Sequence, residues 1–396
     1  MSETKQRAGW GRRVVDWLIF VAIFLWFLCS LLVLTSAPTS LLWVVAILVT
    51  EWGHYAGCIA LLLAVLSWRR GSLGRAMSVL ALVSAALCFS PAIRAAGINR
   101  SLPQRITAAF GSLQSVNGRA RPFSALDLFL GVPTSGVEVT EHVYTQRGST
   151  PLKLDLYRSR EIVAPQPIVI MIHGGAWRTG SKAELPALNR YLAQQHYAVA
   201  SIDYRLAPES RSPAAVDDAF QAIDYLKTNA AALRLDPTRM VLIGRSAGGQ
   251  IALAVAYAGR EPAIRGVVGF YSPSDLVLGY EKPSRRWVID SCKVLRDYLG
   301  GTPIEKPDAY AVASPINFVN ANTPPTLLIH GQLDPLVWPE QSERLAARLK
   351  ENGRPYFHLY IPWGTHGCDA NLNGPSGQLS VYAIDRFLAY AFHAPL

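Results

Sequence analysis

Cysteine is scarce in this sequence. Only five of the 396 residues are cysteines, and none has the spacing by which cysteines ligate zinc. Cys29, Cys58 and Cys88 lie in apolar runs, where a free cysteine behaves as a small hydrophobic residue. A disulfide-rich scaffold and a cysteine-ligated metal site are therefore excluded. Cys292 and Cys368 remain as a pair that can form one disulfide, with two unrelated buried thiols as the alternative.

Internal repeats, low-complexity tracts and basic runs interleaved with aromatic residues are also absent. Their absence argues against a repeat protein and against a nucleic-acid-binding surface. Acidic residues are fewer than basic ones, 28 against 38, so the formal net charge is +10. Because part of this excess flanks long apolar segments, we expect anionic membrane lipid, and no nucleic acid, to be the charged partner.

Long apolar runs dominate the first hundred residues. Residues 14–34, 41–68 and 76–93 form three such runs, and about 20 residues of helix cross a hydrocarbon core. A cleaved signal peptide is the alternative for the first run, but no small-residue cleavage site closes it and two further runs follow. We therefore predict that residues 1–94 are a membrane anchor with three transmembrane helices.

Basic residues beside these runs predict the orientation, because cytoplasmic loops retain Lys and Arg. Such residues precede the first run and lie between the second and third, whereas the turn at residues 35–40 has no charge. Three crossings that start in the cytoplasm place the rest of the chain on the non-cytoplasmic side. Arg94, Arg100 and Arg105 weaken the asymmetry and favour the alternative of two crossings.

Glu51 and His54 lie three residues apart in the second apolar run, and hence on one face of a helix. Ionisable groups at such a depth are usually paired. We expect them to bond each other or neighbouring helices, with transport or lipid binding as the alternative.

Residues 95–136 carry scattered Gly, Ser, Pro and Arg and are predicted to be a linker, with a short amphipathic helix at 102–113. Residues 137–396 alternate short β-rich runs with helical stretches, which predicts an α/β domain whose mostly parallel sheet has helices on both faces. An antiparallel hairpin at 139–157 opens this domain. The predicted inner strands are residues 168–172, 198–202, 240–243, 267–270, 326–329 and 356–361, and the predicted helices are residues 214–233, 247–258, 340–351 and 378–391.

The sequence GRSAGG at residues 244–249 directly follows a predicted strand and opens a predicted helix. This is the context that a GxSxG nucleophile elbow requires, so Ser246 is the candidate nucleophile. A sharp strand-to-helix turn needs residues without side chains on both sides of the serine, and the helix N-terminus favours developing negative charge. An ordinary Gly-rich helix entry is the alternative.

The sequence HGGAW at residues 173–177 ends another strand, at the edge of the sheet where the elbow also lies. Its small residues allow backbone N–H groups to approach an anionic intermediate, and each such donor stabilises the transition state by about 3 kcal/mol. We expect an oxyanion hole formed by Gly174, Gly175 and Ala176 with Ala247 across the elbow. His173 is expected to hold this loop by hydrogen bonds.

A serine needs a base, and the base needs a carboxylate that orients it. Asp334 in HGQLDPLV and His366 in WGTHGC each follow a predicted strand, in the order Ser, Asp, His. We therefore predict a catalytic triad of Ser246, Asp334 and His366, which requires neither metal nor organic cofactor. His330 and Asp369 are the nearest competitors and are expected to be structural.

From about residue 144 to 392 the chain resembles the hormone-sensitive-lipase and carboxylesterase branch of the α/β-hydrolases. The motifs HGGAW, DYRLAPE (203–209), PAAVDDA (213–219) and GRSAGG occur in family order. The chain is also similar to isoprenylcysteine methylesterases, which have membrane segments before the enzyme. The resemblance implies an α/β-hydrolase fold and hydrolysis of small-molecule esters, with short to medium acyl chains suggested by HGGAW and a compact cap.

Two departures from the family pattern bear on the substrate. Arg245 occupies a position where the family more often has Asp, Glu, His or Gln, so it is expected to place a cation near the pocket, and the loop has HGGAW where a third Gly is usual. Residues 275–308 stand where hydrolases insert a cap, with an ordinary helical connection as the alternative. Transfer of the acyl group to an alcohol, and a catalytically idle binding domain, are the alternative functions.

Overall fold

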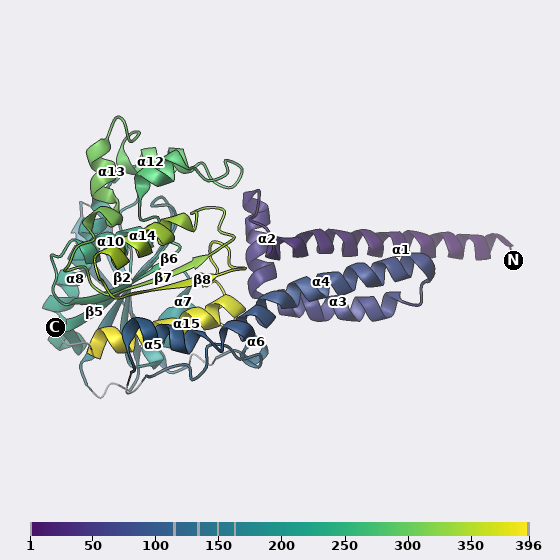
Figure 1. Cartoon of the computed structure of the whole chain (residues 1–396), viewed down its shortest axis with the longest axis horizontal. Coiled ribbons are helices and arrows are strands. Elements are labelled where there is room, and N and C mark those ends of the chain that lie inside the picture. The colour runs from purple at the N-terminus through teal and green to yellow at the C-terminus, as the bar shows by residue number, and fades with distance from the viewer. Residues whose placement is uncertain (1, 114–115, 133–134, 149, 162–163, 394–396) are drawn as a thin grey trace.

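The alternating segments build an eight-stranded sheet in the computed structural model, which describes residues 2–113, 116–132, 135–148, 150–161 and 164–393 (Figure 1). The strand order is β1-β2-β4-β3-β5-β6-β7-β8. The pairs β1/β2 and β2/β4 are antiparallel and the other neighbouring pairs are parallel. The strands are β1 Val137–Arg147, β2 Thr150–Ser159, β3 Gln166–Ile172, β4 Ala198–Ile202, β5 Leu235–Arg245, β6 Ile264–Phe270, β7 Thr326–Gly331 and β8 Tyr356–Ile361.

Helices cover both faces of this sheet. Ile168 and Ile170 of β3 belong to the buried cluster on one face, whereas Val169 and Met171 belong to the cluster on the other, as the two-residue period of a strand requires. The first cluster includes residues of α8 Ala214–Thr228, α10 Ala247–Tyr257 and α14 Glu340–Glu351, and the second includes residues of α5 Leu102–Phe110, α7 Pro186–Gln194 and α15 Pro375–His393.

The predicted α/β-hydrolase sheet is confirmed, and its inner strands lie where the sequence placed them. The predicted helix at 214–233 is interrupted at Asn229, so that α9 Ala230–Leu233 follows α8 as a separate turn. Three helices and a 3₁₀ turn connect β6 to β7 over the region where a cap was considered: α11 Leu276–Glu281, α12 Ser291–Leu299, α13 Pro307–Ala313 and η2 Pro315–Phe318.

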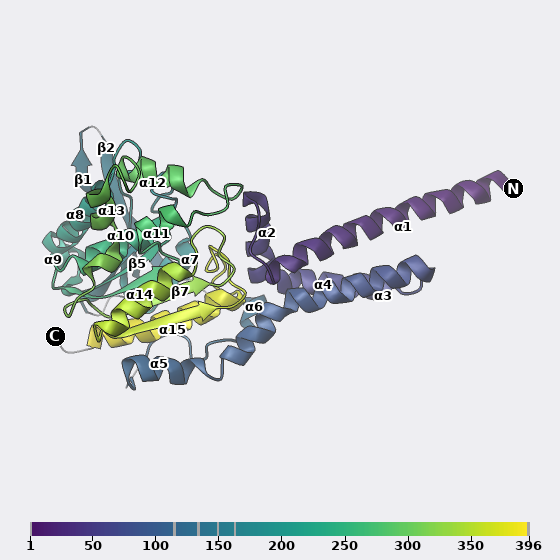
Figure 2. The same ribbon diagram turned by 45° about the horizontal axis from the view of Figure 1, so that its top comes forward.

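The apolar N-terminal part forms helices that extend away from the sheet (Figures 1 and 2). Two of them are long and apolar enough to cross a membrane, over Val14–Val33 and Gly71–Ile98. We predicted that the second apolar run forms a single helix, and this prediction is wrong. The run forms two helices, Ser40–Glu51 and Gly53–Ser67, with an angle of 81° between them. The elements are α1 Ser2–Ser30, η1 Leu31–Val33, α2 Ser40–Glu51, α3 Gly53–Ser67, α4 Gly71–Ile98 and, before β1, α6 Asp127–Leu130.

Glu51 and His54 lie on either side of this bend and do not bond each other. The Glu51 carboxylate accepts hydrogen bonds from Ser376 at 2.6 Å (Oγ) and 3.2 Å (backbone N), whereas His54 Nε2 donates to the Leu128 carbonyl at 3.1 Å. The bend thus separates α2, which packs against the sheet domain, from α3, which packs against α4.

The N-terminal helices share a core with the sheet domain. Val33, Val49 and Cys88 belong to the same buried cluster as Trp363 and Leu379, which follow β8. The segment that we predicted to be a linker contributes to it as well, through α5, whose Leu102, Ile106 and Phe110 are buried. The N-terminal helices and the sheet domain are thus packed against each other through side chains.

Candidate active site

Ser246 lies at a sharp turn between β5 and α10. Its backbone has φ 52° and ψ −120°, a conformation that a residue with a side chain rarely adopts. A Cβ at Gly244 would lie 2.1 Å from the Gly248 carbonyl oxygen, and one at Gly248 would lie 2.2 Å from the His173 carbonyl oxygen. Both positions therefore require glycine, because backbone occupies the space that a side chain would need.

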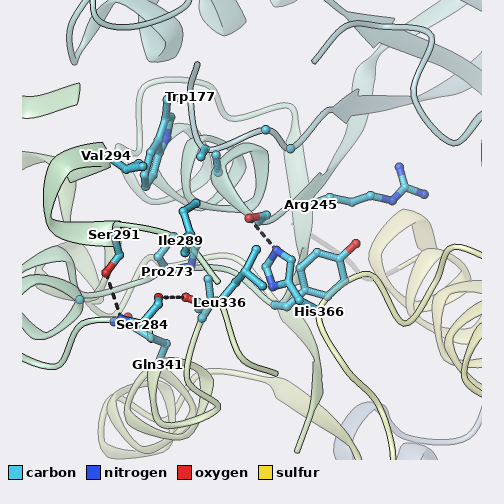
Figure 3. A pocket seen from close by; sticks show the side chains of 18 of the residues that line it. Trp177, Arg245, Pro273, Ser284, Ile289, Ser291, Val294, Leu336, Gln341 and His366 are labelled. Carbon is cyan, nitrogen blue, oxygen red and sulfur yellow. Dashed lines mark hydrogen bonds between the residues drawn. The ribbon is translucent and has the colours of Figure 1, made fainter. Parts of the chain in front are cut away.

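A chain of hydrogen bonds joins Ser246, His366 and Asp334, and the dashed line at His366 in Figure 3 marks its bond to Ser246. His366 Nε2 lies 3.0 Å from Ser246 Oγ, and His366 Nδ1 lies 2.7 Å from Asp334 Oδ2. The carboxylate accepts the Nδ1 proton, so Nε2 is left to accept the proton of the serine hydroxyl. The three side chains come from the ends of β5, β7 and β8, which meet at one edge of the sheet.

Asp334 is fully buried and ionised. Burial raises the pKa of this carboxyl group, but the charges and hydrogen bonds of His366 and His330 outweigh burial and lower the pKa to about 2. The other carboxylate oxygen accepts backbone N–H bonds from Leu336 at 2.8 Å and Val337 at 2.9 Å. His330, considered as a competitor for the base, instead lies 3.3 Å from Asp334 and supports it.

The HGGAW loop lies beside Ser246, since a Cβ at Gly174 would lie 3.5 Å from Ser246 Cβ. Gly174, Gly175, Ala176 and Ala247 all line the cavity beside Ser246. His173 Nδ1 donates to the Gly174 carbonyl at 2.8 Å, and burial lowers the pKa of His173 to about 4, so this ring is neutral at pH 7. The structure thus brings together around Ser246 all the residues predicted for the oxyanion hole.

Trp177 connects this loop to the segment between β6 and β7. Its Nε1 donates to Gln250 Oε1 at 2.9 Å, and its ring stacks on Tyr298 of α12 with centroids 4.3 Å apart. Gln250 Oε1 also accepts from the Tyr298 hydroxyl at 3.2 Å. The loop, the helix after the nucleophile and α12 are therefore held in one arrangement.

The pocket above Ser246 has a volume of about 440 Å³, within the range of small-molecule sites. Ile289, Val294 and Leu295 from the segment between β6 and β7 form part of its apolar wall, so this segment covers the site as a cap does. Leu336 and Trp43 also contribute to the apolar wall.

We had expected Arg245 to place its charge near the pocket, and this prediction is wrong. Its side chain points away from the pocket (Figure 3) and its Nε donates to Asp369 Oδ2 at 2.5 Å. The Tyr271 hydroxyl donates to the other oxygen of Asp369 at 2.5 Å. Both charged side chains are buried, 6% and 3% exposed, so this pair supports the loop that follows β8.

The sequence did not identify two aromatic residues of the site. The Tyr271 ring lies 4.3 Å from the His366 ring between centroids, and Trp43 Nε1 donates to the His366 carbonyl at 2.8 Å. Tyr271 directly follows β6, and this position at the end of a strand was the signal in the sequence that could have identified it as a site residue. Trp43 had no such signal, because it lies in an apolar run 323 residues before the histidine that it contacts.

The disulfide considered between Cys292 and Cys368 is absent, and both thiols are free. Cys368 is buried in the cluster that contains Trp363, whereas Cys292 Sγ lies 3.5 Å from the Tyr280 carbonyl oxygen in the cap. The cap and the loop after His366 both border the pocket, but these side chains have different neighbours.

Comparison with known proteins identifies the family. The BD-FAE family matches residues 154–349. The esterase LipC of Mycobacterium tuberculosis is 31% identical over 257 residues, which cover 61% of this chain and 63% of LipC. An arylesterase of Saccharolobus solfataricus is 31% identical over 208 residues, which cover 50% of this chain and 67% of that protein.

A probable isoprenylcysteine α-carbonyl methylesterase of Arabidopsis thaliana, ICMEL1, is 27% identical over 235 residues, covering 54% of this chain and 48% of the relative. The chain therefore spans about half to two thirds of the length of these relatives. A solved bacterial heroin esterase has the same fold, with a TM-score of 0.58, 22% identity, and coverage of 75% of this chain and all of the other.

Replacement of Arg245 by Gln is expected to destabilise the protein and to leave its preference for charged substrates unchanged. The substitution leaves Asp369 buried without its partner charge, which costs about 3–5 kcal/mol of unfolding free energy. Denaturant unfolding of the full chain in detergent measures this loss. Arg348→Gln is the matched control, because that exposed pair with Glu351 contributes less than about 1 kcal/mol. A stable variant with altered preference for anionic esters would show that Arg245 faces the substrate.

Proposed function

The chain belongs to the hormone-sensitive-lipase and carboxylesterase branch of the α/β-hydrolases, and on that basis we propose that it hydrolyses carboxylic esters through an acyl-enzyme on Ser246. The hydrogen-bond chain from Ser246 through His366 to Asp334, at 3.0 and 2.7 Å, supports this proposal most directly. It gives the serine a base and gives that base a fixed orientation inside an apolar pocket.

In the first half-reaction Ser246 Oγ attacks the ester carbonyl carbon while His366 Nε2 takes the hydroxyl proton. The imidazolium that forms is stabilised by the ionised Asp334, whose low pKa keeps it charged throughout. Backbone N–H groups of Gly175, Ala176 and Ala247 stabilise the negative charge on the substrate oxygen. His366 then returns the proton to the leaving alcohol, and the acyl group remains on the serine.

In the second half-reaction water replaces the alcohol. The water oxygen attacks the acyl carbon while His366 Nε2 takes a proton from the water. The tetrahedral intermediate then collapses, His366 returns this proton to Ser246 Oγ as the C–Oγ bond breaks, and the carboxylic acid is released. Acyl transfer to another alcohol follows the same steps with a different acceptor. Product analysis in the presence of added alcohol separates the two outcomes.

We also propose that the protein is a membrane protein with three crossings and a non-cytoplasmic sheet domain. The helices α1, α3 and α4 extend side by side away from the sheet, with the start of α1 at the far end (Figures 1 and 2). Arg70, in the turn between α3 and α4, pairs with Asp16 of α1 at 2.6 Å, so these basic ends lie on one side. With 15 residues, α3 is about 22 Å long, which requires a locally thin bilayer.

Single substitutions of the triad test the mechanism. Ser246→Ala, Asp334→Asn and His366→Ala should each lower kcat for p-nitrophenyl butyrate at least about a thousandfold, because residues of one catalytic unit fail together. Ser159→Ala, at the end of β2, is the matched control and should retain full activity. A fluorophosphonate should label the wild type and the control but not the Ser246 variant. Turnover near that of the wild type in the Ser246 variant would refute the acyl-enzyme.

The acyl-chain preference is tested with p-nitrophenyl esters of increasing length. A cavity of about 440 Å³ that also holds the ester group favours acyl chains of up to about eight carbons. We expect kcat/KM to be highest for short and medium chains and to fall beyond that length. A maximum for long-chain esters would contradict this prediction.

The orientation is tested by reporters fused after Leu396. Alkaline phosphatase should be active and a fluorescent protein dark, because the former requires a non-cytoplasmic and the latter a cytoplasmic location. The same fusions after Trp68, in the turn that carries Arg69 and Arg70, should give the opposite result. A fluorescent fusion at Leu396 would support two crossings instead of three.

A further inference from the structure

Helix α2 lies across the axis of the N-terminal bundle, between that bundle and the sheet domain (Figures 1 and 2). It makes an angle of 81° with α3. If α1 and α4 cross a membrane, α2 therefore lies along the membrane surface, on the side of the sheet domain.

One face of α2 contacts the loop that carries His366. Trp43 Nε1 donates to the His366 carbonyl at 2.8 Å, and Trp43 also lines the pocket. A Cβ at Gly367 would lie 3.2 Å from Ile47 Cδ1, so this side chain packs closely on the loop. One turn further along, the Glu51 carbonyl accepts from Asn371 Nδ2 at 3.0 Å. Residues 43, 47 and 51 recur every four positions and form one side of the helix.

The beginning of α2 contacts the cap. The Ser40 backbone N–H donates to the Trp287 carbonyl at 3.0 Å, and Arg285 Nη1 donates to the Ser36 carbonyl at 3.2 Å. Residues 282–290 connect α11 to α12 and contribute Lys282, Ser284 and Ile289 to the pocket. The helix thus joins the two walls of the pocket, the cap and the His366 loop.

A second face of α2, adjacent to the one that contacts the His366 loop, is apolar and exposed. Leu41, Val44 and Leu48 are 72%, 48% and 52% exposed, and their spacing of three and four residues places them on one side of the helix. Trp287 on the adjoining cap loop is 81% exposed and directly follows Arg285 and Arg286. Apolar side chains bordered by tryptophan and basic residues are typical of a surface that lies in the interface of an anionic membrane.

We propose that α2 is the lipid-contacting wall of the pocket and that the pocket takes an amphiphilic ester anchored in the bilayer. This inference rests on the proposed esterase function and names the class of its substrate. The cavity of about 440 Å³ encloses the ester group and a short acyl chain, while the remainder of the molecule stays in the lipid beside α2. The family match begins at residue 154, so α2 lies outside the part of the chain that the family shares.

The test compares two esters with the same acyl group and the same reporter. Full-length protein is reconstituted in phosphatidylcholine and phosphatidylglycerol nanodiscs and given 4-methylumbelliferyl butyrate or an umbelliferyl butyrate that carries a hexadecyl chain. Rates are normalised to active sites titrated with a fluorophosphonate. We expect kcat/KM to be about tenfold or more higher for the anchored ester, because the membrane delivers it to the pocket.

The variant Leu41→Gln/Val44→Gln/Leu48→Gln removes the exposed apolar face of α2. Its ratio of kcat/KM, anchored ester over soluble ester, is expected to fall about tenfold. The matched control is Ile304→Gln/Val312→Gln, which removes two apolar side chains of the cap that are 93% and 59% exposed. Val312 belongs to α13 and Ile304 precedes it by three residues, and α13 lies at the side of the cap away from α2 (Figure 1). This control should keep the ratio of the wild type.

Three outcomes separate the two proposals. The inference is supported if the ratio of kcat/KM for the anchored ester to that for the soluble ester falls in the α2 variant but not in the control, while the fluorophosphonate still labels both variants. An unchanged ratio in that variant, or a wild type that prefers the soluble ester, overturns it while leaving Ser246-dependent hydrolysis in place. Absence of Ser246-dependent hydrolysis of both esters overturns the proposed function, and the inference with it.

Discussion

The loop that carries His366 is held by two buried carboxyl groups, those of Asp369 and Glu51. Asp369 binds Arg245, next to the nucleophile, and also accepts from Tyr271. Glu51 comes from the end of α2 and accepts from Ser376, at the start of the helix that follows the loop. Removal of one partner from the buried Arg245–Asp369 charge pair is strongly destabilising, and the Glu51–Ser376 hydrogen bonds tie the far end of the same loop to α2, so the position of His366 depends on both contacts. The catalytic geometry and the attachment of the N-terminal helices thus share one set of interactions.

Most of the sheet and the residues at its edge could be predicted because their signals are local. Strands such as 198–202 are short apolar runs bounded by turn residues, and the conformation of Ser246 follows from glycines on either side of it. The order of Ser246, Asp334 and His366 along the chain, each after a strand, was enough to bring them to one edge, since parallel strands end there together.

The parts that could not be predicted depend on partners far away in the sequence. The apolar run 41–68 has no Pro to mark its bend, and its two halves pack on different neighbours, α2 on α15 and α3 on α4. The residues next to Arg245 in the sequence do not decide whether its side chain faces the pocket or points away from it. Its direction depends on Asp369, which is 124 residues further along the chain. The sequence indicated that Cys292 and Cys368 both lie near the pocket. It could not show that their side chains pack against different neighbours and do not form a disulfide.

The contact between Trp43 and His366 has a consequence for biosynthesis. The two residues are 323 positions apart, so at roughly 5–20 residues per second the ribosome needs roughly 16–65 s after Trp43 to reach the histidine. During that interval the inner face of α2, including the Glu51 carboxylate, has no protein partner in the sheet domain. Because α2 is apolar along almost its whole length, the lipid interface can hold it during this interval. One wall of the pocket is therefore synthesised long before the catalytic base.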